Sequence, residues 1–321
     1  MEANPIKIYL KTPARLHLGL IDMNGDLGRM FGGLGVGIDH PNVIINAQSA
    51  ADLKITGEKT DLAQEITNHF STKYHLSPKV HLHIAQTIPC HSGLGSGTQL
   101  ALAIAVALAK ISNLKASVPE LAASVGRAKR TSVGTSIFEY GGFVVDGGKN
   151  PKTNQAPPLI YHQPFPEDWC FIVASPNQPK GLASSEEKQA FNKLTTMPAQ
   201  DVGQICRLIM LKLLPAIAEQ DIETFGVALT EIQVLTGNHF AQAQGGTYAK
   251  PQATKCIEFM QQQGAYGVGQ SSWGPALYAI VKRQQATTFL TKVQDHLKAN
   301  TGGEAFIAQA NNKGATIQIE D

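Results

Sequence analysis

Residues 89–109 read PCHSGLGSGTQLALAIAVALA, and this stretch predicts the centre of the fold. Glycines alternate with small residues, and a long apolar run follows at once. Glycine lets the backbone come close to a ligand, while the first turn of a helix offers unpaired N–H groups and the positive end of its dipole. The order of loop and helix therefore predicts a phosphate site. A glycine-rich turn that only caps a buried helix is the alternative.

The spacing separates this loop from two common phosphate loops. No Gly-Lys-Ser/Thr closes it, as a P-loop requires, and it is not a GxGxxG turn after the first strand of a dinucleotide fold. The residues expected to bind phosphate are those of the loop and of the first helical turn, namely Ser92, Gly93, Leu94, Gly95, Ser96, Gly97 and Thr98.

The composition is that of an ordinary globular protein. The 321 residues carry a formal net charge of +2, with 16% charged and 43% hydrophobic residues, so the charge balance does not favour a nucleic-acid partner. No apolar run reaches about 18 residues, and the first residues lack a signal core. The four cysteines form no CxxC pair, which argues against a zinc site or a disulfide framework. We expect a cytoplasmic protein with small-molecule partners, no nucleic acid, no membrane and possibly a homodimer.

Alternating apolar residues predict strands over residues 6–10 and 16–20. The glycine-rich residues 22–39 predict a loop whose backbone passes close to a ligand, with a plain hairpin connection as the alternative. Arg15 and Arg29 favour the ligand, because guanidinium groups beside bare backbone suit phosphate or carboxylate.

Further strands are expected at residues 43–45, 53–55 and 80–84, with helices over 61–74 and 118–130. His81 and His83 share one face of their strand, but no third metal ligand is near in sequence, so we expect them to pack or to face solvent. The glycine-rich residues 132–150 supply Glu139 and Asp146, the carboxylates available to hold Mg²⁺ or to act as a base.

Five prolines between residues 150 and 167 predict a domain boundary near residue 160, which divides the chain into residues 1–160 and 161–321. The second half predicts an α+β domain with a small antiparallel sheet. Its expected elements are strands at 170–174, 278–281 and 315–319, and helices at 201–220, 221–235, 249–263 and 285–300. Pro215 should kink or split the first of these helices.

The loop at residues 89–103 resembles the phosphate-binding motif of the GHMP kinase superfamily, in which Pro-x-x-x-Gly-Leu-Gly-Ser-Ser opens a helix. Residues 265–281 resemble in part a third motif of that superfamily, which folds back over the phosphates. This resemblance implies phosphate contacts from Gly269, Gln270, Ser271 and Ser272. It also implies an α+β, two-domain GHMP-kinase-like fold, with a ribosomal protein S5 domain 2-like N-terminal domain and a ferredoxin-like C-terminal domain.

Two departures from the kinase pattern are informative. Trp273 and Pro275 stand where kinases have a more flexible Ser-Gly-x-Gly-Gly turn, and the tryptophan offers an aromatic face. Many superfamily kinases also carry a catalytic aspartate shortly before a Gly-Gly pair, but residues 132–138 read SVGTSIF and contain no acid. Either the base is dispensable or the reaction is not ATP-dependent phosphorylation.

Six segments in order look like the β-ribofuranosylaminobenzene 5'-phosphate synthase family. They are TPARLHLGLID, DLGRMFGGLGVGI, PCHSGLGSGTQLALA, SVGTSIFEYGGFVVDGG, AQAQGGTY and GVGQSSWGPALY. The resemblance implies that 4-aminobenzoate or 4-hydroxybenzoate is joined to C1 of phosphoribosyl pyrophosphate, with loss of CO2 and pyrophosphate, in tetrahydromethanopterin biosynthesis.

That chemistry suggests roles for individual residues. Arg15, His17 and Glu139 are the expected catalytic residues, and Arg29 is expected to bind phosphate. Substrate contacts are expected from Lys11, Gly32, Gly33 and Trp273. Mg²⁺ on the pyrophosphate is expected as the cofactor, with Thr98 and Glu139 as candidate ligands. Arg127 and Arg130 complete the candidate cations for the ribose 5'-phosphate and the carboxylate.

Two other functions stay open on the sequence alone. One is a small-molecule kinase that uses ATP, with Asp22, Glu139 or Asp146 in place of the missing aspartate. The other is a relative without catalytic activity that binds a phosphorylated metabolite as a sensor.

Overall fold

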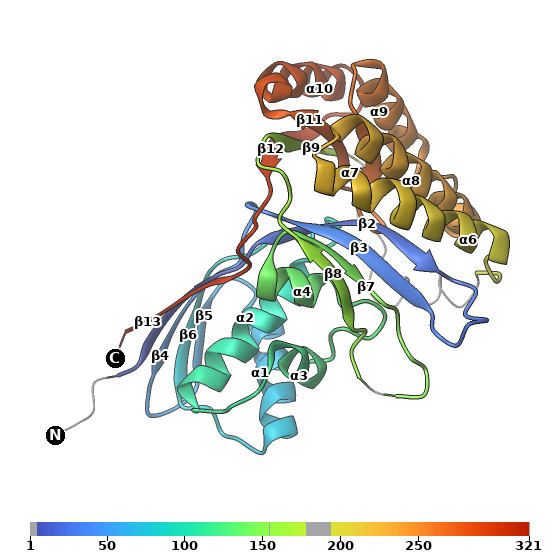
Figure 1. Cartoon of the computed structure of the whole chain (residues 1–321). Coiled ribbons are helices and arrows are strands. Elements are labelled where there is room, and N and C mark those ends of the chain that lie inside the picture. The colour runs from blue at the N-terminus through green and yellow to red at the C-terminus, as the bar shows by residue number, and fades with distance from the viewer. Residues whose placement is uncertain (1–4, 154, 178–193, 321) are drawn as a thin grey trace.

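The computed structural model describes residues 5–153, 155–177 and 194–320. The first of its three sheets has the strand order β13-β1-β4-β6-β5. These strands are β1 (Lys7–Lys11), β4 (Ile44–Ser49), β5 (Lys54–Gly57), β6 (Val80–Gln86) and β13 (Thr316–Glu320). The helices α1 (Thr60–Tyr74), α2 (Ser96–Ile111) and α3 (Val118–Ser124) lie together on one side of this sheet (Figure 1).

The helix α2 is buried on every side, which explains its unbroken apolar sequence. None of its residues from 99 to 109 is more than 4% exposed. A helix in a core needs no polar face, so the pattern lacks the amphipathic stripe that α1 shows. The predicted strand, loop and helix over residues 80–109 are confirmed.

The second sheet has the order β2-β3-β7-β8 and is antiparallel throughout. Its strands are β2 (Ala14–Asp22), β3 (Phe31–Ile38), β7 (Phe143–Asp146) and β8 (Leu159–Gln163), and α4 (Val133–Tyr140) packs on β3 and β7. Of these four strands, β2 contributes residues to the cleft described below.

The prediction of a loop over all of residues 22–39 is wrong, because β3 occupies residues 31–38. Its glycines bring α4 close to the sheet. A Cβ atom at Gly35 would lie 2.3 Å from Val133 Cγ1, and one at Gly33 would lie 2.7 Å from Val133 Cγ2. Glycine inside a strand marks such a close approach as readily as it marks a turn.

The third sheet, in the order β10-β11-β9-β12, is also antiparallel. It comprises β9 (Trp169–Pro176), β10 (Gly267–Gln270), β11 (Leu277–Lys282) and β12 (Gly303–Gln309). The side chains of Cys170, Ile172 and Ala174 on β9 belong to the core beneath α9 (Pro251–Gln262) and α10 (Ala286–Asn300), while Phe171 and Val173 belong to the main core. Burial on both faces explains why β9 is apolar from Trp169 to Ala174.

The helices between β9 and β10 follow the predicted break at Pro215. The chain forms α6 (Ala199–Leu208), one π-helical turn (Ile209–Leu213) and α7 (Leu214–Glu219), then the long α8 (Ile222–Gln244). The helix α8 contacts both β10 and β2, so it links the second and third sheets. It extends nine residues beyond the predicted end at residue 235.

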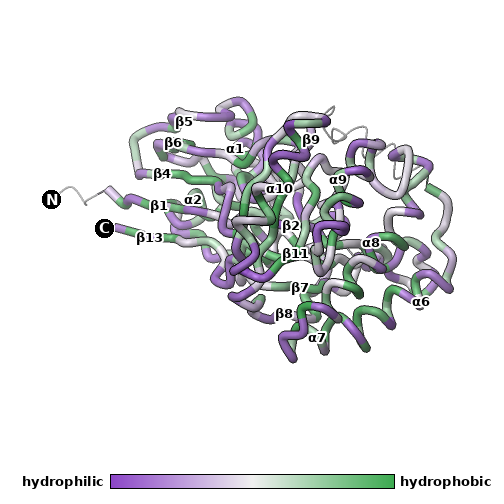
Figure 2. The backbone as a smooth tube through the Cα atoms, turned by 90° about the horizontal axis from the view of Figure 1, so that it is seen from above, coloured by the Kyte–Doolittle hydropathy of each residue, from purple (hydrophilic) through white to green (hydrophobic). Residues whose placement is uncertain are grey.

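The last strand crosses the predicted boundary at residue 160. β13 pairs with β1 along its whole length, from Lys7 with Glu320 to Lys11 with Thr316, so the first and last strands are neighbours in the first sheet (Figure 1). The division into residues 1–160 and 161–321 stays a prediction. Hydrophobic residues, green in Figure 2, are concentrated where the sheets and helices pack against one another. No helix among the described residues is long and apolar enough to cross a membrane.

Candidate active site

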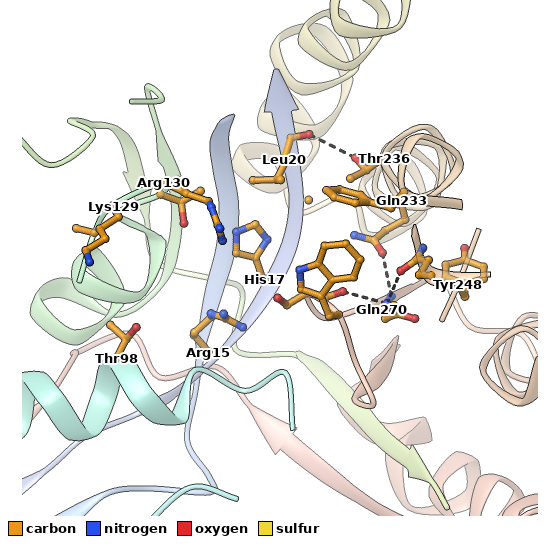
Figure 3. A pocket seen from close by; sticks show the side chains of 18 of the residues that line it. Arg15, His17, Leu20, Thr98, Lys129, Arg130, Gln233, Thr236, Tyr248 and Gln270 are labelled. Carbon is orange, nitrogen blue, oxygen red and sulfur yellow. Dashed lines mark hydrogen bonds between the residues drawn. The ribbon is translucent and has the colours of Figure 1, made fainter. Parts of the chain in front are cut away.

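A cavity of about 590 Å³ lies where β2, α8 and the segments before α4 and β11 meet (Figure 3). Its lining comes from segments far apart in the sequence: β2, the start of α2, residues 126–131, α8 with the two residues 247 and 248, and the turn after β10. The lining residues are Arg15, His17, Gly19, Leu20, Thr98, Gly126, Arg127, Ala128, Lys129, Arg130, Thr131, Gln233, Thr236, Gly237, Phe240, Gln244, Thr247, Tyr248, Gln270, Ser272 and Trp273.

The cavity divides into a basic wall and a neutral wall. Lys129, Arg130, Thr98 and Arg15 lie on one side of His17, and Thr236, Gln233, Gln270 and Tyr248 lie on the other (Figure 3). Arg127 belongs to the same basic loop, residues 126–131. Among the described lining residues none is aspartate or glutamate. The basic wall therefore suits a strongly anionic ligand.

One backbone carbonyl joins the glycine-rich loop to the two other motifs. The Gly93 oxygen accepts a hydrogen bond from Arg15 Nη1 at 2.6 Å and another from the Ser271 hydroxyl at 2.7 Å. The buried Ser271 oxygen in turn accepts the backbone N–H of His17 at 2.9 Å. These bonds hold β2, the loop and the turn after β10 in one rigid arrangement.

The glycines of the loop let arginine side chains approach the start of α2. Gly95 has φ +83°, and a Cβ atom there would lie 2.7 Å from Arg15 Cγ. At Gly97 a Cβ atom would lie 3.3 Å from the Arg127 guanidinium. The first turn of α2 carries no acidic residue, so its N–H groups and both guanidinium groups present positive charge together. Of the loop residues, Thr98 lines the cavity.

The Arg127 side chain is partly buried in the basic wall. Burial lowers the pKa of its guanidinium, which nevertheless stays charged, and Glu65 partly opposes that shift. Its Nε atom is buried and has no hydrogen-bond partner among the described residues. A buried donor left unpaired is costly, so an anionic ligand would satisfy it.

His17 lies between the basic wall and the neutral wall (Figure 3). Burial of the ring, as the main cause, and the charge of Arg15 together lower the pKa of the His17 imidazole to about 3. The ring is therefore neutral at physiological pH. It can exchange hydrogen bonds with a ligand, but it does not supply a proton as a charged acid.

Asp146 is an anchor for the fold and does not line the cavity. Its carboxylate accepts the N–H of Ser132 at 2.8 Å and that of Gly148 at 3.0 Å, and it also accepts from Gly33 and Val133. Burial raises the pKa of Asp146 to about 6, against these hydrogen bonds. The carboxylate thereby caps α4 and ties it to β3.

The structure brings some predicted site residues into the cavity and leaves others outside. Arg15, His17, Thr98, Gln270, Ser272 and Trp273 line it. Arg29 is exposed and donates to the Gly148 carbonyl, and Lys11 is exposed on β1. Gly32 and Gly33 pack against Ile21, Asp146 and Val133.

The predicted metal ligands do not come together. Thr98 lines the cavity, whereas Glu139 lies near the end of α4, about 9 Å along the helix from its first residues. No group of three or more His, Cys, Asp or Glu side chains that could hold a metal occurs in the described part of the chain. His81 and His83 were not expected to bind a metal. Their ring atoms Nε2 and Nδ1 lie 3.3 and 3.1 Å, respectively, from the Thr56 hydroxyl.

Sequence reasoning predicted Gln270 and Trp273 of the neutral wall but missed the part that α8 and Tyr248 supply. Gln233, Thr236, Phe240 and Gln244 recur every three or four residues on α8, which is the spacing of one helix face. The pattern was visible, but the predicted helix ended at residue 235, before Phe240. Tyr248 ends the segment AQAQGGTY, whose resemblance to the family assigns this residue no role.

Two family models match the chain. The GHMP kinases N terminal domain matches residues 61–142, and GHMP kinases C terminal matches residues 213–299. The chain is 33% identical over 296 residues to the beta-ribofuranosylphenol 5'-phosphate synthase of Methanothermobacter thermautotrophicus, covering 86% of this chain and 89% of that protein. It is 32% identical to the protein of the same name from Archaeoglobus fulgidus, covering 97% of this chain and all of the relative.

Solved structures of low sequence identity share the fold. The homoserine kinase of Cytophaga hutchinsonii superposes with a TM-score of 0.71 at 15% identity, covering 99% of this chain and 98% of that one. The mevalonate diphosphate decarboxylase of Staphylococcus aureus gives a TM-score of 0.71 at 14% identity, covering 98% of each chain. These likenesses confirm the expected α+β, GHMP-kinase-like fold.

Proposed function

Because the chain belongs to the beta-ribofuranosylphenol 5'-phosphate synthase family, on a GHMP kinase fold, we propose that it is a decarboxylating phosphoribosyl transferase. It joins the ring of 4-hydroxybenzoate or 4-aminobenzoate to C1 of phosphoribosyl pyrophosphate and releases CO2 and pyrophosphate. We place the reaction in tetrahydromethanopterin biosynthesis, in the cytoplasm.

One observation carries the proposal: a cleft with four cations on one wall has no carboxylate among its described lining residues. A GHMP kinase that activates a hydroxyl group with an aspartate would need an acid here. The cations instead suit a donor that carries a 5'-phosphate and a pyrophosphate. Charge that develops on the leaving pyrophosphate is stabilised by Arg15, Arg127 and the first N–H groups of α2.

The bonding changes explain why no base is needed. The ring carbon that bears the carboxylate forms a bond to ribose C1, and the bond from C1 to the pyrophosphate oxygen breaks, with its electron pair leaving on pyrophosphate. The bond to the carboxylate carbon then breaks, CO2 departs, and that electron pair restores the aromatic ring. The group lost from the ring is CO2 rather than a proton, so a neutral His17 is sufficient in a cleft whose described lining residues include no acid.

The residues present do not fit a magnesium site built from protein ligands alone. Mg²⁺ prefers carboxylate and phosphate oxygens, and Thr98 is the one predicted ligand that lines the cleft. We propose that Mg²⁺ enters as the salt of the pyrophosphate, as part of the substrate.

The experiment incubates the purified chain with phosphoribosyl pyrophosphate, Mg²⁺ and carboxyl-labelled 4-hydroxybenzoate or 4-aminobenzoate, without ATP. We expect labelled CO2 and pyrophosphate in equal amounts, with a ribosylated aromatic product in the mass spectrum. A parallel incubation with ATP and homoserine or mevalonate serves as the kinase arm. ADP formation there, with no labelled CO2, would establish the kinase instead. No product in either arm, with phosphoribosyl pyrophosphate still bound, would favour the sensor.

A further inference from the structure

The neutral wall of the cleft has the shape and chemistry of an aromatic site. The rings of Phe240 and Trp273 meet edge to face, with centroids 4.8 Å apart and planes at 74°. Phe240 is 8% exposed and Tyr248 is 7% exposed, and all three side chains line the cavity. Rigid aromatic surfaces of this kind bind planar rings at little entropic cost.

The hydrogen bonds around Trp273 fix its position. Ser271, two residues earlier, is held by Gly93 and His17, as described above. The side-chain amide of Gln270 accepts the backbone N–H of Ala249 at 2.7 Å and donates to the Ser272 carbonyl at 3.0 Å. The backbone N–H of Gln270 donates to the side-chain oxygen of Gln233 at 2.9 Å. These hydrogen bonds hold the turn that carries Trp273 against α8 and the loop before α9. The aromatic wall is therefore formed before a ligand binds.

Tyr248 differs from the other polar residues of this wall. Gln233, Gln244, Gln270 and Thr236 all make hydrogen bonds to protein groups. The Tyr248 hydroxyl makes none to any residue that the structure describes. Burial raises the pKa of Tyr248 to about 12, so the hydroxyl is neutral at physiological pH and can both donate and accept.

The proposed reaction fixes how a ring must lie in this cleft. Its carboxylate-bearing carbon has to reach ribose C1, which is held at the basic wall. The opposite edge of the ring, with the 4-hydroxyl or 4-amino group, then points away from the cations, and Tyr248 lies at that end (Figure 3).

We propose that Phe240 and Trp273 form the acceptor subsite for the aromatic acid, with the Tyr248 hydroxyl as the hydrogen-bond partner of the ring's 4-substituent. The assignment rests on the proposed function. It makes Tyr248 the residue that separates a 4-substituted benzoate from benzoate itself.

Binding can test the subsite without turnover. The dissociation constants of 4-hydroxybenzoate, benzoate and, separately, phosphoribosyl pyrophosphate are measured by titration calorimetry. In Tyr248→Phe we expect 4-hydroxybenzoate to bind about five- to tenfold more weakly, the value of one hydrogen bond, while benzoate stays within twofold. In Trp273→Ala we expect both aromatic acids to bind about tenfold more weakly or worse, with phosphoribosyl pyrophosphate unchanged.

Matched variants guard against general damage. Tyr266→Phe removes a tyrosine hydroxyl outside the cleft, and Trp169→Phe replaces the other tryptophan, which packs with Phe165 and Phe225. Both should bind all three ligands like the wild type. Phe240→Leu is a milder change than Trp273→Ala and replaces it in the test if the alanine variant is unstable. It should also weaken the binding of both acids.

The outcomes separate the subsite from the function. Equal effects of Tyr248→Phe on the two acids, or unchanged binding in both Trp273→Ala and Phe240→Leu, would overturn the subsite even in a chain that forms product. A wild type that binds neither 4-hydroxybenzoate nor 4-aminobenzoate would overturn both. Subsite behaviour as expected, with no CO2 released, would overturn the function alone.

Discussion

Arg15 has two tasks within one side chain. Its Nη1 atom donates to the Gly93 carbonyl, and the same residue lines the basic wall of the cleft. Replacement by alanine should therefore remove positive charge from the reaction and release the glycine-rich loop. We expect Arg15→Ala to lower kcat/KM by about 100-fold or more, while the thermal midpoint falls by a few degrees.

Steady-state kinetics and thermal unfolding of the same preparations check this expectation. Arg207→Ala, which removes an exposed arginine on α6, is the matched control and should keep wild-type kinetics. A loss of activity in Arg15→Ala no larger than its loss of folded protein would make Arg15 a structural residue only.

His17 should make the stability of the fold sensitive to acid. Its pKa is about 3 in the folded chain against an ordinary value of 6.5, so between these values the unfolded chain binds the additional proton. Stability is therefore lost as the pH falls below 6.5, by about 1.4 kcal/mol per pH unit. We expect His17→Gln to lose about 2.5 kcal/mol less stability than the wild type between pH 7 and pH 4.5.

Denaturant unfolding at the two pH values measures this difference. The opposite contribution of Asp146, whose pKa is raised, is present in both proteins and cancels. His69→Gln, on the surface of α1, should follow the wild type. Parallel pH profiles for wild type and His17→Gln would show that His17 is not buried as a neutral ring.

Sequence reasoning at this scale identified some of the residues that line the cleft and misplaced others. Arg15, His17 and Thr98 stand in motifs whose chemistry is visible locally, and all three line the cleft. Lys11, Arg29 and Glu139 were chosen for charge and proximity in sequence, and the structure places them outside it. A charge alone does not tell which face of a strand or which end of a helix carries it.

At the level of elements, the start of α2 depends on glycine at position 95. Its φ of +83° is unfavourable for other residues, and a Cβ atom would come 2.7 Å from Arg15 Cγ. We expect Gly95→Ala to displace Arg15 and to weaken phosphoribosyl pyrophosphate binding about tenfold or more, with about 1–2 kcal/mol of lost stability.

Titration calorimetry with phosphoribosyl pyrophosphate measures the loss. Gly203→Ala is the control, since that glycine lies in α6 with no atom within 4 Å of an added Cβ, and alanine there should be neutral or stabilising. Unchanged binding in Gly95→Ala would mean that the diphosphate does not depend on this loop.

The glycine-rich elements show the limit of local patterns. Glycines at the start of α2 do form a turn, as predicted, but those of β3 and β10 lie within strands, where close packing requires them. A Cβ atom at Gly269 on β10 would lie 2.3 Å from the Tyr278 hydroxyl. The space available at a glycine depends on elements from elsewhere in the chain, so these strands and α4 were not visible in the sequence.

At the scale of the whole molecule, β13 completes the first sheet by pairing with β1. Deleting residues 316–321 would leave the backbone of β1 unpaired at the sheet edge and uncover Ile8 and Leu10, which are buried. We expect a lower thermal midpoint by several degrees and a greater tendency to aggregate.

Differential scanning calorimetry and light scattering check the deletion. Ile317→Thr, which alters a side chain that is already 37% exposed but keeps the backbone pairing, should change the midpoint much less. A deletion variant as stable as the wild type would show that the pairing with β13 contributes little.

The sequence identified the fold class through its motifs and not through its strand order. Long-range pairings such as β13 with β1 join residues about 300 positions apart, and nothing in the pattern of either strand names its partner. The neutral wall also depends on long-range contacts, because α8 and the turn after β10 meet β2 only in the folded chain. The sequence pattern of any one of these segments therefore does not show it.

We propose that the basic wall binds the diphosphate of the substrate in a cleft whose described lining residues include no acid. A crystal structure of the chain with phosphoribosyl pyrophosphate tests it most directly. We expect density for the diphosphate between the first turn of α2 and residues 126–131, within hydrogen-bonding distance of Thr98 or Arg127. Density for the diphosphate on the Phe240 and Trp273 wall, or outside the cleft, would contradict it.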